Sequence, residues 1–173
     1  MNKTGIFAKN FFATKIKKGE KMTLTQKEYS LLSDLKSQEQ LCVEKYARYE
    51  SEAKDPTLKN LFNSIKTTEG NHLGTVQRML GGEEVTMPMT PMAASEMLVF
   101  TPSTASETDK KKDAFLCADA LSMEKHVSSV YDTAIFEFQS PVMRDTLAHI
   151  QKEEQIHGEK LYEYMAQNGM YSG

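Results

Sequence analysis

The chain has 173 residues and a formal net charge of −3; 39% of the residues are hydrophobic and 26% are charged. This length fits one globular domain that buries a core and excludes a large multidomain enzyme, and the composition suits a soluble helical protein better than a β-sandwich or a disordered tail. The absence of Trp, with five Pro and 11 Met, favours a helical protein, and no apolar run approaches the roughly 20 residues of a transmembrane segment.

Residues 1–22 form a basic leader. Six Lys and a single acid lie in the first 21 residues, which therefore carry a net charge of +5 and leave −8 on the remaining chain. An acidic body argues against a nucleic acid as partner. The leader lacks the continuous apolar segment and the small-residue cleavage site of a secretory signal peptide. One interpretation of its Lys and apolar residues is an amphipathic segment that lies on a membrane surface.

The end of this leader also has an interpretation at the level of the gene. The codons of Lys18-Gly19-Glu20-Lys21 can contain AGGAG, the purine-rich sequence that binds bacterial ribosomes just upstream of a start codon. We therefore expect Met22 to be the natural initiator, and the residues before it to be disordered or not translated.

Start and stop signals predict two helices in the first half of the chain. The spacing Thr25-x-x-Glu28 is a capping box, which predicts a helix from Thr25 to about Ala53. Asp55-Pro56 then supplies an N-cap and a proline at the first position of a second helix, which ends at Gly81-Gly82.

The second half repeats this arrangement after a long connection. Residues 83–107 hold three Pro and many Ser and Thr, which predicts a loop or crossover. A third helix is predicted from about Asp109 to Gln139, and Ser140-Pro141 opens a fourth that ends near Gly169. Residues 23–169 are thus predicted to form an all-α four-helix bundle of two hairpins, with a long crossover between the second and third helices.

An internal repeat relates the two halves at an offset of 85 residues. Of the 50 positions from 23 to 72, twelve are identical to the position 85 residues later, whereas chance gives about three. The repeat predicts two hairpins related by a pseudo-twofold axis. Identical pairs include Glu39 and Glu124, Tyr46 and Tyr131, Glu69 and Glu154, and His72 and His157.

Each predicted helix carries an apolar stripe at steps of three and four, the pattern of a bundle core. A glutamate interrupts every stripe near its middle, and in the second and fourth helices a histidine follows three residues later. Six polar groups are therefore predicted to meet in one layer of the core: Glu39, Glu69, His72, Glu124, Glu154 and His157.

Four buried carboxylates need compensation, because each costs several kcal/mol to bury and they repel one another. Two divalent cations would balance the four negative charges, and two neutral imidazoles would complete the coordination. Tyr46 and Tyr131 lie two turns after Glu39 and Glu124, where they are expected to donate hydrogen bonds that orient ligand carboxylates. The alternative is a relic of a metal-binding ancestor, in which the Glu and His side chains satisfy one another or bind water.

Other residues with metal-binding side chains have simpler interpretations. Cys42 and Cys117 form no Cys-x-x-Cys pair and are predicted to be buried as small apolar residues. Histidines and glutamates that lie off the stripes are not expected to be ligands, and this set comprises His126, His149, Glu44, Glu52 and Glu137.

The order Glu, Glu-x-x-His, Glu, Glu-x-x-His on four helices resembles the ferritin-like di-metal carboxylate superfamily, over residues 23 to about 168. The resemblance implies that Glu69 and Glu154 bridge two iron or two manganese ions. The terminal ligands would be Glu39 and His72 for one ion, and Glu124 and His157 for the other.

The Glu-x6-Tyr spacing is similar to that of the rubrerythrins, one family in this superfamily. Val127 stands where peroxidase-type rubrerythrins carry an additional Glu, three residues after Glu124, and the chain has no rubredoxin-like iron module. A rubrerythrin-type peroxidase mechanism is therefore disfavoured.

A closer resemblance is to the Coat F family of spore coat proteins from endospore-forming bacteria, which share the ferritin-like bundle. It rests on the stretches MTLTQKEY, EQLCVEKYARY and DPTLKNLF, and on Glu-x-x-His before QRML. The resemblance implies synthesis during sporulation in the mother-cell cytoplasm, without a signal peptide, and deposition in the spore coat. Other coat proteins would then be its partners, and we expect a homo-oligomer.

Two functions from different classes follow. In the first, the protein is structural and its metal acts as a clip that stabilises the fold. In the second, it is a di-iron or di-manganese oxidoreductase of catalase or peroxidase type that acts on hydrogen peroxide, with no catalytic side chain assigned. The family resemblance favours the first and the complete ligand set the second, whereas iron storage is disfavoured because nothing resembles the fifth helix of ferritin cages.

Overall fold

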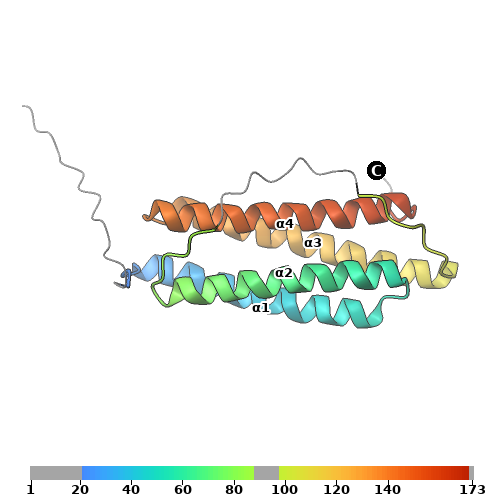
Figure 1. Ribbon diagram of the computed structural model, residues 1–173, viewed down its shortest axis with the longest axis horizontal. Coiled ribbons are helices and arrows are strands. Elements are labelled where there is room, and N and C mark those ends of the chain that lie inside the picture. Colours follow the sequence, from blue (N-terminus) through green and yellow to red (C-terminus); the bar gives the residue numbers. More distant parts are fainter. Residues whose placement is uncertain (1–20, 88–97, 172–173) are drawn as a thin grey trace, which may run out of the picture.

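The fold was analysed in a computed structural model, which describes residues 21–87 and 98–171. Within these ranges the chain forms four helices and no strand (Figure 1). None of these helices has a stretch apolar enough to cross a membrane. The helices are α1 (Gln26–Glu52), α2 (Pro56–Leu80), α3 (Glu107–Glu137) and α4 (Pro141–Gln167).

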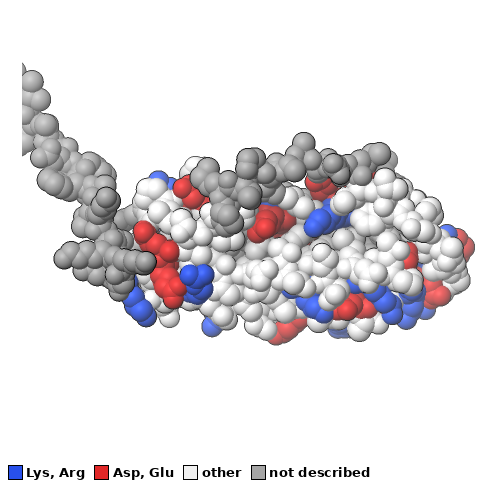
Figure 2. All heavy atoms as spheres, viewed as in Figure 1, with Lys and Arg blue, Asp and Glu red and all other residues white. Residues whose placement is uncertain are grey.

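The four helices pack side by side as two antiparallel hairpins, α1 with α2 and α3 with α4 (Figure 1). The hairpins join through contacts of α1 with α3 and of α2 with α4. Each helix therefore has two antiparallel neighbours, as in the predicted bundle. On the face shown in Figure 2, acidic and basic side chains are interspersed with uncharged surface.

The predicted start signals cap α1, α2 and α4. The Thr25 hydroxyl accepts a hydrogen bond from the Glu28 backbone N–H at 3.2 Å, and the Glu28 carboxylate accepts one from the Thr25 N–H at 2.8 Å, which completes the capping box. The side chains of Asp55 and Ser140 accept from backbone N–H groups in the first turns of α2 and α4. These three helix starts are confirmed.

The predicted limits of the third helix are wrong by two residues at each end. Ser106 is the N-cap, because its hydroxyl accepts a hydrogen bond from the Asp109 N–H at 3.2 Å, so α3 begins at Glu107. At the other end, Phe138 leaves the helix with a ψ of 135°. This turn buries the Phe138 ring, which is 3% exposed, against the core.

The connection between α2 and α3 contacts α4 near both of its ends. The Thr146 hydroxyl, in the second turn of α4, donates a hydrogen bond to the Val85 carbonyl. At the far end, the Gln167 side chain accepts one from the Phe100 N–H at 2.8 Å. Residues 88–97, the middle of the predicted crossover, lie outside the described residues.

Most of the predicted basic leader also lies outside the described residues, which begin at residue 21. The Met22 N–H donates a hydrogen bond to the Gly82 carbonyl at 2.8 Å. Gly82 has a φ of +81°, and a Cβ atom there would lie 2.7 Å from the Met22 carbonyl oxygen. Only glycine fits this turn after α2, because both the backbone conformation and the close approach exclude a side chain.

The predicted apolar stripes form one continuous core in the centre of the bundle. Cys42 and Cys117 are 1% and 0% exposed and form no disulfide, as predicted. The largest fully buried side chains come from all four helices and include Tyr46, Phe62, Leu32, Leu35, Ile65, Tyr131, Leu147, Ile150 and Tyr164.

Two buried carboxylates link each hairpin to the turn of the other one. On α3, the Asp113 carboxylate accepts hydrogen bonds from the N–H groups of Lys54 and Asp55 at 2.8 and 2.9 Å, in the turn between α1 and α2. Its counterpart 85 residues earlier, Glu28 on α1, accepts one from the Gln139 N–H at 3.0 Å, in the turn between α3 and α4. The pseudo-twofold repeat thus extends to how the hairpins hold each other.

Asp113→Asn should lower the free energy of unfolding by about 2 kcal/mol, because the amide keeps one acceptor and turns a donor toward a buried N–H group. Urea unfolding followed by far-UV circular dichroism measures the change. Asp34→Asn, at an exposed position on α1, is the matched control. Equal stability of the two variants would contradict a capping role for Asp113.

Candidate metal centre

All six polar groups of the predicted layer lie together in the middle of the bundle. Glu39 comes from α1, Glu69 and His72 from α2, Glu124 from α3, and Glu154 and His157 from α4. Each is at most 3% exposed. Their side chains form two overlapping groups, and within each group one ligand atom per residue lies within 4.8 Å of the others.

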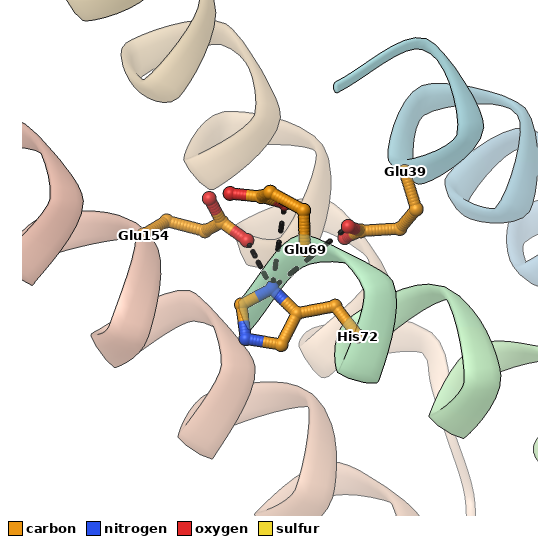
Figure 3. A group of neighbouring side chains, drawn as sticks. All are labelled: Glu39, Glu69, His72 and Glu154. Atoms are coloured by element: carbon orange, nitrogen blue, oxygen red, sulfur yellow. Dashed lines mark ion pairs between the residues drawn. The ribbon is translucent and has the colours of Figure 1, made fainter. Parts of the chain in front are cut away.

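The first group contains Glu39, Glu69, His72 and Glu154 (Figure 3). Three carboxylates from three helices converge on the Nδ1 atom of His72. Nδ1 lies 2.9 Å from Glu154 Oε1, 3.5 Å from Glu69 Oε2 and 3.8 Å from Glu39 Oε2.

The second group contains Glu69, Glu124, Glu154 and His157 and mirrors the first. His157 Nδ1 lies 2.8 Å from Glu69 Oε1, 3.5 Å from Glu124 Oε2 and 3.6 Å from Glu154 Oε2. Glu69 and Glu154 belong to both groups. The two imidazole rings stack with their centroids 5.8 Å apart.

Two tyrosines hold the outer carboxylates from across the bundle. Tyr131 on α3 donates a hydrogen bond to Glu39 on α1, and Tyr46 on α1 donates one to Glu124 on α3. Both rings are fully buried. Each tyrosine therefore fixes the orientation of one carboxylate and leaves that carboxylate's second oxygen directed to the cluster.

Eight buried side-chain atoms of the six residues have no hydrogen-bond partner. They include both oxygens of Glu69 and Glu154 and the Nδ1 atoms of both histidines, although nitrogen and oxygen atoms approach within 2.9 Å. These contacts lie within hydrogen-bond distance but lack its angular geometry. A buried polar atom without a partner costs about 1–3 kcal/mol, so the cluster fits a bound group that accepts electron pairs from oxygen and nitrogen, as a divalent cation does.

The four carboxyl groups fall into two classes, because burial raises the pKa of all four but the imidazoles outweigh it at only two of them. Burial, with repulsion from Glu69 and Glu154, raises the pKa of Glu39, and burial also raises the pKa of Glu124 to about 8. For Glu69 and Glu154, burial acts in the same direction, but the close imidazoles of His157 and His72 outweigh it and lower both pKa values.

For the two histidines, burial and the neighbouring carboxylates shift the pKa in opposite directions. Burial favours neutral imidazole, but the surrounding carboxylates outweigh it and raise the pKa of His72 to about 12 and that of His157 well above its ordinary value. Without a cation, the directions of these pKa shifts favour a neutral cluster, with Glu69 and Glu154 ionised, both histidines as imidazolium, and Glu39 and Glu124 protonated. Two divalent cations could replace these four protons without changing the net charge.

Sequence reasoning missed Glu153, which contacts the other ring nitrogen of His72. His72 Nε2 lies 2.9 Å from Glu153 Oε2, and this hydrogen bond directs Nδ1 to the cluster. The counterpart of Glu153 on α2 is Thr68, which bonds to its own helix at the Ser64 carbonyl. The two halves of the centre therefore differ at this position.

The off-stripe residues lie away from the cluster. His126 is exposed, and His149 is partly exposed and lies 3.6 Å from Glu153. The three glutamates that lie off the stripes are exposed: Glu44, Glu52 and Glu137.

Comparison with known protein families found a match over part of the chain. The family model of the Coat F domain matches residues 112–172, which cover most of α3, the whole of α4 and the residues Glu124, Glu154 and His157. The first hairpin lies outside the match. No curated protein and no solved structure matches the chain.

Proposed function

We propose that the chain is a Coat F-like spore coat protein with a ferritin-like four-helix bundle, in which a buried di-metal carboxylate centre stabilises the fold. The Coat F match over the second hairpin supports the coat assignment. The 85-residue repeat supports extending it to the first hairpin, because that hairpin supplies the equivalent residues.

The eight unpaired buried atoms carry the metal proposal. They belong to six residues of four different helices. Glu69 and Glu154, which are common to both groups, would bridge the two ions. Glu39 and His72 would complete one site, and Glu124 and His157 the other.

The donor set suits iron or manganese, since four carboxylates and two imidazoles are oxygen and nitrogen ligands of intermediate hardness. A cation bound only by the folded state adds RT ln(1 + [L]/Kd) to stability, about 2.7 kcal/mol at a hundredfold excess over Kd. Because each helix contributes at least one ligand, this clip would hold all four together. Such a gain suits a protein whose role is to persist in a coat.

A second candidate function is a catalase- or peroxidase-type di-iron or di-manganese oxidoreductase. One observation favours it: a surface pocket is lined in part by Glu124 and Glu154, so small solutes have a short route to the centre. Bound redox-active ions would supply the electron transfer to hydrogen peroxide. Against it, Val127 stands three residues after Glu124, where peroxidase-type rubrerythrins carry an additional Glu, and its side chain is fully buried.

Localisation and partners follow from the same proposal. Synthesis in the mother-cell cytoplasm without a signal peptide would precede deposition on the forespore surface. The partners would be other coat proteins and further copies of the chain.

Metal analysis of untagged protein, followed by a peroxide assay on the occupied sample, tests both functions. We expect about two Fe or Mn ions per chain, a higher melting temperature than that of the metal-free protein, and no rapid oxygen release or peroxide consumption. Rapid turnover would instead favour the enzyme. Protein that binds neither ion, when purified natively and after reconstitution, would refute the metal centre.

A further inference from the structure

We propose that divalent cations reach the buried centre through the pocket between α3 and α4, and that Gly158 and Ser128 keep this entrance open. The inference rests on the proposed function as a metal-binding protein. The inference adds the route by which a cation would enter the protein and the residues that would set the width of this route.

The pocket lies directly outside the second half of the centre. Its volume is about 360 Å³, and two of its wall residues, Glu124 and Glu154, belong to the cluster. The other five residues come from the facing surfaces of the two helices, Leu121, Lys125 and Ser128 on α3 and Gln155 and Gly158 on α4.

The internal repeat provides a comparison within the same molecule. At the equivalent positions of the first hairpin, Val43 replaces Ser128 and Leu73 replaces Gly158. Both are larger apolar side chains, and both are partly buried. One pocket on the first hairpin, among the residues that the structure describes, includes none of the six cluster residues and is lined by Tyr29, Ser33, Lys36, Ser37, Gln40 and Leu80. The two hairpins therefore supply equivalent proposed ligands but differ in the side chains that cover these ligands.

Gly158 is unfavourable for the helix but leaves space in the pocket. It lies inside α4, where glycine costs about 1 kcal/mol relative to alanine. A Cβ atom there would lie 3.6 Å from Leu121 Cδ1, an ordinary contact, so alanine fits. A leucine, as at the equivalent position 73, would extend beyond this contact and fill the space in front of Glu124 and Glu154.

The residues that line the pocket also include two proposed ligands of the cation. Glu124 and Glu154 are the two cluster residues that line it, and their unpaired carboxylate oxygens are buried just beyond it. Lys125 is the one positively charged residue among those that line the pocket, and it is exposed. The residues at the inner end of the pocket are therefore themselves proposed ligands, so a cation that entered here would meet them first.

Rapid mixing of metal-free full-length protein with Co²⁺ tests the route, because the visible absorption of bound Co²⁺ reports uptake without any enzymatic assay. Gly158→Leu should take up Co²⁺ at least about tenfold more slowly than wild type, since entry then needs local opening of packed helices. The final Co²⁺ content should be unchanged, because no ligand is altered. Ser128→Val, which copies the first hairpin, should also slow uptake, whereas Gly158→Ala should stay near the wild-type rate.

Gly74→Leu is the matched control, because a Cβ atom at Gly74 meets nothing within 4 Å and the residue does not line the pocket. It should load at the wild-type rate. Wild-type rates in Gly158→Leu and in Ser128→Val, with normal final content, would overturn the route and leave the metal centre intact. If wild-type protein takes up no Co²⁺ at all, both the route and the proposed function are wrong.

Discussion

Glu154→Gln and Glu69→Gln should each weaken metal binding at both sites, so that the affinity for the metal is at least about 100-fold lower than that of wild type. These two residues belong to both groups of the cluster, so each substitution removes an anionic oxygen ligand from both ions. Even residues that only orient a ligand change metal affinity by about 10–100-fold. Glu52→Gln, on the surface of α1 with its side chain 45% exposed, should retain the wild-type content.

Glu124→Gln separates loss of the ligand from loss of the fold. The raised pKa of Glu124, about 8, means that this carboxyl is largely protonated at neutral pH in the metal-free protein, and an uncharged amide imitates it. We therefore expect near wild-type stability without metal but loss of about one ion per chain. Metal content is measured by elemental analysis and stability by urea unfolding of the metal-free proteins. Equal metal content in the Glu154, Glu124 and Glu52 variants would contradict the ligand assignment.

Metal binding should release about four protons per chain near pH 7, and the affinity should fall steeply as the pH falls. The metal-free cluster holds protons on His72, His157, Glu39 and Glu124, whose pKa values are all raised. Ligation requires all four groups to be deprotonated. Because the metal-free state binds more protons than the loaded state, rising pH favours loading and acid opposes it.

Isothermal titration calorimetry in two buffers of different ionisation enthalpy measures the number of protons released. The Glu124→Gln variant is an internal control, since its amide has no proton to release and its count should be lower. Binding without proton release, or an affinity that rises on acidification, would show that the metal-free cluster is not neutral in this way.

The starts of α1, α2 and α4 and the residues of the apolar stripes could be predicted from the sequence, because they depend on neighbours within about one turn. Thr25, Asp55 and Ser140 cap their helices through backbone groups two or three residues away. The limits of α3 were wrong because several Ser, Thr and acidic residues near Ser106 compete to cap that helix, and tertiary contacts of Phe138 decide its end.

The sequence also placed the six polar groups in one layer, because a spacing of three or four residues keeps side chains on one helical face. Their role as metal ligands remains a prediction. Glu153 shows the limit of this reasoning: it lies about 100° round the helix from Glu154 and reads as a surface residue. It contacts His72 only because α4 packs antiparallel against α2 in one particular register.

By itself, then, the sequence determined the four helices, the pseudo-twofold repeat and the acidic layer in the core, since all three follow from local spacing along one chain. The tertiary structure alone decided which tyrosine holds which glutamate, which turns Asp113 and Glu28 cap, and on which side the centre meets a pocket. The hydrogen bonds among these features join residues 58 to 111 positions apart. The physical reason is that helical periodicity fixes the direction of a side chain from its own axis, whereas the distance between two helices depends on packing along their whole length.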